Sequence, residues 1–156
     1  MLFGEIIRES SIDLHISPQS KEDVLRHLVH TLLESHPGID PKVAESAVLE
    51  REFALSTGVG QGVAVPHATL QNLDEPLVGF GRCDDGIDFG SMDGQPVKLL
   101  FLLLAPENAI SLHLKLLSRI SRLCNNTELR ETLLTIPTAR EVIDLIRKHE
   151  SAYREL

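Results

Sequence analysis

Two hydrophobic patterns follow one another in the first third of the chain. Apolar and polar residues alternate over residues 12–16, which predicts a short, half-buried strand. Over residues 20–35 the apolar positions instead recur every three or four residues, which predicts an amphipathic helix. Asp40 followed by Pro41 is typical of an N-cap and the first residue of a helix. We therefore expect a second helix that ends near residue 52 or 53.

The middle of the chain is dominated by apolar stretches of strand length. Residues 63–65 and 77–82 are predicted as strands, and residues 87–89 as a short extended piece. Residues 97–104 are almost continuously apolar, as expected for a central strand that is covered on both faces. Pro106 is expected to end this strand because proline lacks the backbone N–H that a sheet uses.

Helical spacing returns in the last third of the chain. It predicts helices over residues 112–123 and 128–134. A final helix is expected to begin at Thr138, since Glu141 follows it at the spacing of a capping box. Strands and helices thus interleave, which favours an α/β fold: a single layered domain over residues 1–156 with a mixed sheet.

Composition narrows the classes of partner and compartment. The net charge of −8, without a cluster of Lys or Arg, argues against a nucleic-acid surface. Cys83 and Cys124 form no metal-binding pair and fit a reducing, cytoplasmic location. The longest apolar run, residues 97–105, is too short to cross a bilayer, so we expect no membrane insertion. His27 and His30 share a helix face, but a solvated face is the favoured interpretation and no metal is expected.

The segment from Ser56 to Ala68 is the strongest candidate for a functional site. Its glycines alternate and lead into a short strand, which Pro66 is expected to stop, so that the chain leaves the sheet. His67 would then lie at a sheet edge, open to a partner, where histidine can act as base, metal ligand or phosphoryl-accepting nucleophile. The glycines fit neither a dinucleotide fingerprint nor a P-loop. The alternative is a flexible approach to a strand without a site.

Two further residues are candidates for the same chemistry. His113 falls at the start of the third predicted helix, where backbone N–H groups favour anions, so it could help to hold a phosphate or steer His67. The alternative is a partly buried histidine of the first turn. Arg51 lies at the end of the second predicted helix and carries a planar fork suited to phosphate oxygens. Alone, it would be interpreted as an exposed helix residue.

These residues resemble the enzyme IIA family of the bacterial phosphotransferase system, in its fructose, mannitol and nitrogen-regulatory branch. The family pattern begins with an acidic or amide residue and ends in an apolar-Ala-apolar-Pro-His sequence. Here the pattern is filled by Glu52, Val59, Gly60 and the stretch from Val63 to Ala68. The Leu-x-Arg-Glu sequence that leads into it and the second histidine also match, so the resemblance covers most of the chain.

The resemblance implies a phosphocarrier with a mixed, roughly five-stranded sheet flanked by helices. His67 would accept a phosphoryl group from HPr or its nitrogen-branch counterpart. Arg51 and His113 would assist as catalytic residues, with Thr57 and Gly58 supporting the phosphate. No cofactor is implied. Because phosphoryl transfer depends chiefly on positioning and charge stabilisation, this set of side chains suits the reaction.

Two uses of the phosphoryl group remain open. It could pass to a cysteine of an enzyme IIB domain in a sugar transporter, or it could act as a mark that controls a target protein in nitrogen regulation. The absence of a IIB or membrane domain favours the regulatory interpretation, although the chain could also be one domain of a larger protein. Thr69 stands where fructose-type chains often carry lysine, which leaves the branch open. A degenerate sensor is a weaker alternative.

Overall fold

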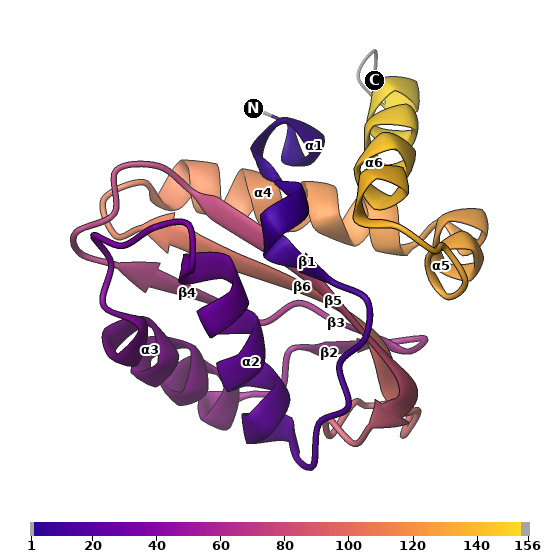
Figure 1. The fold of residues 1–156 in the computed structure, drawn as a ribbon, viewed down its shortest axis with the longest axis horizontal. Coiled ribbons are helices and arrows are strands. Elements are labelled where there is room, and N and C mark those ends of the chain that lie inside the picture. Colours follow the sequence, from indigo (N-terminus) through magenta and orange to yellow (C-terminus); the bar gives the residue numbers. More distant parts are fainter. Residues whose placement is uncertain (1, 154–156) are drawn as a thin grey trace.

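A mixed β-sheet lies at the centre of the computed structural model, which describes residues 2–153 (Figure 1). Within these residues the sheet has six strands: β1 (Ile12–Asp13), β2 (Gly58–Gly60), β3 (Val63–Ala64), β4 (His67–Leu70), β5 (Leu77–Ile87) and β6 (Val97–Pro106). Their order is β1-β5-β6-β3-β2, and β4 pairs with β6 beyond the end of β3. The predicted α/β class is confirmed. The sheet has more strands than expected because β2 and β4 were not predicted. The predicted strand 77–82 and the start of the extended piece at Ile87 belong to one strand, β5, and residues 88–89 lie outside it.

The helices form two layers, one on each face of the sheet. They are α1 (Phe3–Ile6), α2 (Lys21–Leu33), α3 (Pro41–Ala54), α4 (Ile110–Cys124), α5 (Thr127–Leu133) and α6 (Ala139–Tyr153), with a short 3-10 turn η1 (Glu9–Ser11). Figure 1 shows α2 and α3 on one side and α1, α4 and α6 on the other. Among residues 2–153, no helix combines the length and the apolar character needed to cross a membrane.

The predicted helix starts are confirmed by their caps. The Ser20 hydroxyl accepts the backbone N–H of Asp23 at 3.0 Å, and the Asp40 carboxylate accepts that of Lys42. Thr138 caps α6 in the same way through the N–H of Glu141 at 3.2 Å. Each bond satisfies a donor that the first turn of a helix otherwise leaves free, which is why the sequence signal was reliable at these positions.

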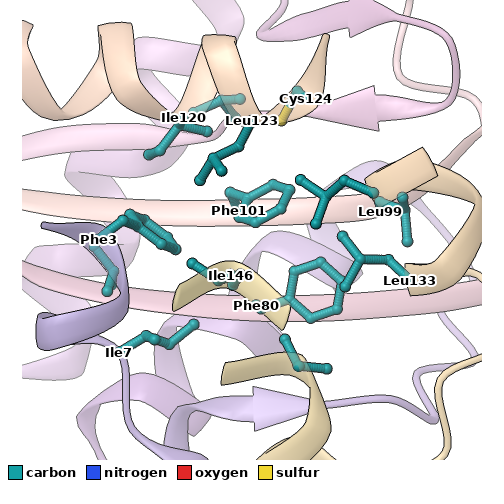
Figure 2. Packing of buried hydrophobic residues seen from close by; sticks show 14 of the residues in the cluster. Phe3, Ile7, Phe80, Leu99, Phe101, Ile120, Leu123, Cys124, Leu133 and Ile146 are labelled. Carbon is teal, nitrogen blue, oxygen red and sulfur yellow. The ribbon is translucent and has the colours of Figure 1, made fainter. Parts of the chain in front are cut away.

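Strand β6 separates two hydrophobic cores. Its side chains at 99, 101 and 103 pack with α4, α5 and α6, whereas those at 100, 102 and 104 pack with α2 and α3. This division follows from the twofold repeat of a strand, which turns successive side chains to opposite faces. Figure 2 shows the first core around Phe101, which contacts both Phe3 and Phe80. The prediction of a central strand covered on both faces is confirmed.

The N-terminal segment is fastened to α6, which the sequence did not indicate. The buried carboxylate of Glu150 accepts the backbone N–H groups of Phe3 and Gly4 at 2.7 and 2.5 Å. Arg147 Nε donates to the carbonyl of Gly4 at 2.9 Å. The fully buried Phe3 ring then meets Phe101 edge to face, with centroids 5.7 Å apart. The four-residue helix α1 therefore depends on partners from the far end of the chain.

The glycine segment forms a defined hairpin between β2 and β3. Gln61 and Gly62 both have positive φ values, 58° and 79°, as a tight two-residue hairpin turn requires. The Asp93 carboxylate accepts the N–H of Gln61 at 2.7 Å and holds this turn from the neighbouring loop. The segment therefore has a regular two-residue turn with a hydrogen-bonded partner outside the hairpin.

Candidate active site

His67 stands where the chain re-enters the sheet, not where it leaves. Pro66 does interrupt the pairing after β3, but its carbonyl still accepts the N–H of Leu103 at 3.0 Å. From His67 to Leu70 the chain then pairs with β6 as the parallel strand β4. The expectation that Pro66 takes the chain out of the sheet is therefore wrong, because a proline removes a donor but keeps its acceptor. His67 itself is half-buried.

The hydrogen bond of His67 selects one of its ring nitrogens. Nδ1 lies 2.8 Å from the carbonyl oxygen of Val65. A carbonyl can only accept, so Nδ1 carries the proton and donates it. Nε2 of the neutral ring is then left with a free lone pair, which is the nucleophilic position.

The surroundings of His67 favour this neutral ring. Burial, the largest cause, lowers the pKa of His67, and the Arg51 guanidinium lowers it further. The hydrogen bond to Val65 and the charge of Glu52 raise the pKa, but the net pKa lies below the usual value of 6.5. At neutral pH the imidazole is therefore a nucleophile and not a cation.

His113 faces His67 from the first turns of α4. The ring centroids are 5.3 Å apart, and His113 is only 9% exposed. Burial lowers the pKa of His113, with smaller contributions from His67 and Arg51, so this ring is also neutral. Its Nδ1 is buried with no hydrogen-bond partner among the described residues. A buried N–H without an acceptor is costly, so the proton belongs on Nε2 and makes that nitrogen a donor.

Arg51 completes a cleft between α3, β4 and α4. The cleft has a volume of about 480 Å³ and is lined by Ala47, Glu50, Arg51, Ala54, His67, Ala68, Thr69 and His113. In the free protein, Arg51 Nη1 donates to the carbonyl of Leu55 at 2.8 Å. The structure thus brings together His67, His113 and Arg51, which lie far apart in the sequence.

Thr57 and Gly58 are not among the residues that line this cleft. The Thr57 hydroxyl is buried and donates to Glu52 Oε2 at 2.5 Å. Gly58 lies against Ser91, where an added Cβ would come within 2.1 Å of the Ser91 hydroxyl. The geometry gives both residues structural partners, so it lends no support to their predicted contact with phosphate.

Glu52 is a residue whose role sequence reasoning missed. Its side chain is 1% exposed and contacts both Lys21 and Thr57, the residue before β2. The only signal in the sequence was that Glu52 is the first residue of the family pattern. The pattern indicates that an acidic or amide residue belongs there but does not say what it does. A carboxylate buried to this degree requires partners, and its partners became visible only in the fold.

The histidine pair of α2 is held by separate carboxylates. His27 Nε2 lies 2.7 Å from Asp13, and His30 Nε2 lies 2.8 Å from Glu45. The two rings therefore have different partners. Over residues 2–153, no group of three or more histidine, cysteine or acidic side chains is arranged to hold a metal ion.

The cleft offers three complementary functions in one place. It presents a neutral nucleophilic nitrogen on His67, a hydrogen-bond donor on His113 and a permanent cation on Arg51. All three side chains line the same cleft. This arrangement suits transfer of a phosphoryl group, in which positioning and charge stabilisation supply most of the catalysis.

The chain belongs to the EIIA 2 family of the phosphoenolpyruvate-dependent sugar phosphotransferase system, whose family model matches residues 5–149. Members of this family are phosphotransferase components that accept and pass on phosphoryl groups. The chain is therefore an EIIA-type phosphocarrier. The resemblance inferred from the sequence is confirmed.

Similar proteins come from both the transport and the regulatory branches. The chain is 37% identical, over 96% of its length, to the fructose-specific EIIABC component of Bacillus subtilis, of which it spans only 24%. It is also 37% identical, over 94% of its length, to a nitrogen regulatory protein of Bradyrhizobium diazoefficiens, of which it covers 95%. The crystal structure of the nitrogen regulatory protein IIA-Ntr from Neisseria meningitidis matches with a TM-score of 0.86 and 34% identity, covering 92% of this chain and 97% of that one.

Proposed function

We propose that His67 is the phosphoryl acceptor of this EIIA-type protein and that Nε2 is the atom that is phosphorylated. The observation that carries the proposal is the hydrogen bond from Nδ1 to the carbonyl of Val65, which leaves Nε2 free. The donor is the phosphohistidine of HPr or of its nitrogen-branch counterpart. The Nε2 lone pair forms the new P–N bond while the donor's P–N bond breaks, and the donor imidazole keeps the bonding electron pair.

Arg51 and His113 stabilise the transferred group through hydrogen bonds and charge, without forming a covalent bond to it. The Arg51 guanidinium balances phosphoryl charge, after exchanging its contact with Leu55 for one with the phosphoryl oxygens. His113 donates its Nε2–H to another oxygen. Both side chains line the same cleft as His67, and neither requires a cofactor for this role.

After His67 is phosphorylated, the phosphoryl group has two alternative uses, which experiment can distinguish. In transport, the phosphoryl group passes to a cysteine of an enzyme IIB domain, as the name of the EIIABC relative suggests. In regulation, the phosphoryl group stays on His67 and changes which target protein binds. The phosphorylated form carries about two additional negative charges at one half-exposed site, which is enough to recruit or reject a partner.

The acceptor assignment is tested by reconstitution. The protein is incubated with phosphoenolpyruvate, enzyme I and HPr, and the acid-labile phosphate is mapped by mass spectrometry. We expect label on His67 alone, and none in His67→Ala. The control is His27→Ala, which removes a surface histidine bonded to Asp13 and should be labelled like the wild type. Label that persists in His67→Ala would contradict the proposal.

The use of the phosphoryl group is tested separately. Labelled protein is mixed with a fructose-type or mannitol-type IIB domain, and the loss of label is timed. Rapid transfer to the IIB cysteine supports transport. Label that persists, together with a target protein that binds wild type and His67→Asp differently, supports regulation.

A further inference from the structure

We propose that Glu52 is a positioning residue for the phosphoryl acceptor: through Thr57 and Val65 it fixes which nitrogen of His67 is free. This inference rests on His67 being the acceptor. It assigns a function to a buried carboxylate that lies outside the cleft and cannot touch the transferred group.

The first link is a pair of hydrogen bonds from Thr57 to Glu52, which together form a two-point grip on Thr57. Glu52 Oε1 accepts the backbone N–H of Thr57 at 2.8 Å, and Oε2 accepts its hydroxyl at 2.5 Å. Both residues are buried, with exposed fractions of 3% and 6%. Hydrogen bonds to a buried carboxylate are strong and directional, so together they fix the orientation of Thr57.

The second link runs from Thr57 to His67 through one residue. The carbonyl of Thr57 accepts the N–H of Val65 at 3.0 Å, and the carbonyl of Val65 accepts from His67 Nδ1 at 2.8 Å. Thr57 and Val65 are each bonded through both their amide and their carbonyl. A displacement of Thr57 would therefore move the carbonyl that holds the imidazole.

Lys21 compensates the negative charge of the buried Glu52 carboxylate. Its ammonium lies 2.7 Å from Glu52 Oε1, donates to the carbonyl of Phe89 at 2.8 Å and sits 4.4 Å from the centre of the Phe89 ring. A buried charge without a partner is strongly destabilising, so this ion pair helps to hold the Glu52 side chain in place. The grip on Thr57 is thus anchored to α2 and to the loop after β5.

The selected nitrogen matters because only an unprotonated nitrogen can attack phosphorus. If the Val65 carbonyl moves away, the proton of His67 is free to occupy Nε2, and the lone pair then lies on the side away from the cleft. Glu52 should therefore affect the rate of transfer without affecting the binding of the donor. Its charge also raises the pKa of His67, so its removal should shift the pH profile to lower pH.

The test combines two series of variants. Glu52→Ala removes the whole grip, whereas Glu52→Gln keeps an amide oxygen that can still accept from Thr57. Thr57→Val removes only the hydroxyl bond, and Thr57→Ser restores it. The matched control is Glu45→Ala on the same helix, which removes a carboxylate paired with Arg26 and His30 at a distance from the cleft.

Two measurements decide the outcome. Nitrogen-15 spectra of the imidazole report the tautomer of His67 without any transfer reaction, and single-turnover kinetics with phosphorylated HPr report the rate. In Glu52→Ala and Thr57→Val we expect the Nε2–H tautomer to appear and the maximal rate to fall by about 10- to 100-fold, with an unchanged half-saturating HPr concentration. Glu52→Gln and Thr57→Ser should recover most of the rate, and Glu45→Ala should match the wild type.

The inference is overturned if folded Glu52→Ala and Thr57→Val keep the wild-type tautomer and rate. If Glu52→Ala does not fold, the comparison of Thr57→Val with Thr57→Ser is decisive by itself, since Thr57→Val retains the backbone bond to Glu52. Failure of the acceptor assignment has a different signature: wild-type protein would carry no label on His67, whatever tautomer the spectra show.

Discussion

Replacement of Arg51 by glutamine should slow phosphoryl acceptance by a moderate factor, because the arginine already has a hydrogen-bond partner in the free protein. Its Nη1 donates to the carbonyl of Leu55 at 2.8 Å. To reach a phosphoryl group on His67, the guanidinium must give up this bond. The side chain gains a contact with a doubly charged anion and loses one with a neutral carbonyl.

The size of the effect follows from these two contacts. A hydrogen bond between charged groups contributes about 1.5–3 kcal/mol, while an exposed bond to a neutral carbonyl contributes about 0.5–1 kcal/mol. The net stabilisation of the transition state is therefore about 0.5–2.5 kcal/mol. At roughly 1.4 kcal/mol for each factor of ten, Arg51→Gln should reduce the rate by about 2- to 60-fold.

The assay is rapid quenching of a single transfer from phosphorylated HPr, with the thermal midpoint recorded for each variant. Arg51→Lys should fall between the wild type and Arg51→Gln, because it keeps the charge but loses the planar fork. Arg140→Gln is the matched control, since it removes an exposed arginine of α6 that pairs with Asp144. A wild-type rate in Arg51→Gln, or equal rates in the lysine and glutamine variants, would refute the reasoning.

Four further outcomes follow from the structure. Because its pKa is lowered, His67 should stay neutral down to pH values below 6.5, so the rate should be flat near neutrality and fall only below that pH; a midpoint at or above 6.5 would contradict this. His113→Ala should slow transfer and lower the free energy of unfolding by less than Phe101→Ala does, since the lost packing is partly offset by removal of a buried nitrogen that has no partner among the described residues; an equal loss in urea denaturation would show otherwise. Glu150→Ala should destabilise by about 2–4 kcal/mol through its two lost backbone bonds, with the transfer rate unchanged. Phe101→Ala should cost about 3–5 kcal/mol, measured in the same way, because it opens a cavity between three elements of the first core.

The elements that the sequence predicted are those whose signals are local. Helices α2 and α6 each carry an amphipathic repeat and a capping residue within a few positions of one another, while α3 is marked mainly by Asp40 and Pro41 at its start. Strand β6 was recognisable from its own apolar run. In contrast, β4 exists because it pairs with residues 103–106, and α1 exists because Glu150 caps it. No window around residues 67–70 or 3–6 contains those partners.

In the candidate site, too, some features could be predicted from the sequence and others depend on the fold. His67, Arg51 and His113 were candidates from their positions at the ends of predicted elements and matched the family pattern, and their meeting in one cleft followed from the fold. The partner of Thr57 was not predictable, because a threonine near a histidine is as consistent with a phosphate contact as with a buried carboxylate. The hydrogen bond from His67 to Val65 depends on how the backbone bends around Pro66, which no residue type specifies.

The bond between Glu150 and the first helical turn has a consequence for how the chain is made. Synthesis proceeds from the N-terminus, so Phe3 and Gly4 emerge from the ribosome long before the carboxylate that will receive them. Until α6 has been added, the face of the sheet that carries Phe101 lacks both its N-terminal cover and its last helix. The other face, built from α2, α3 and the strands up to β6, needs nothing beyond residue 106. The two cores of this protein can therefore close at different times during translation, with the one against α2 and α3 first.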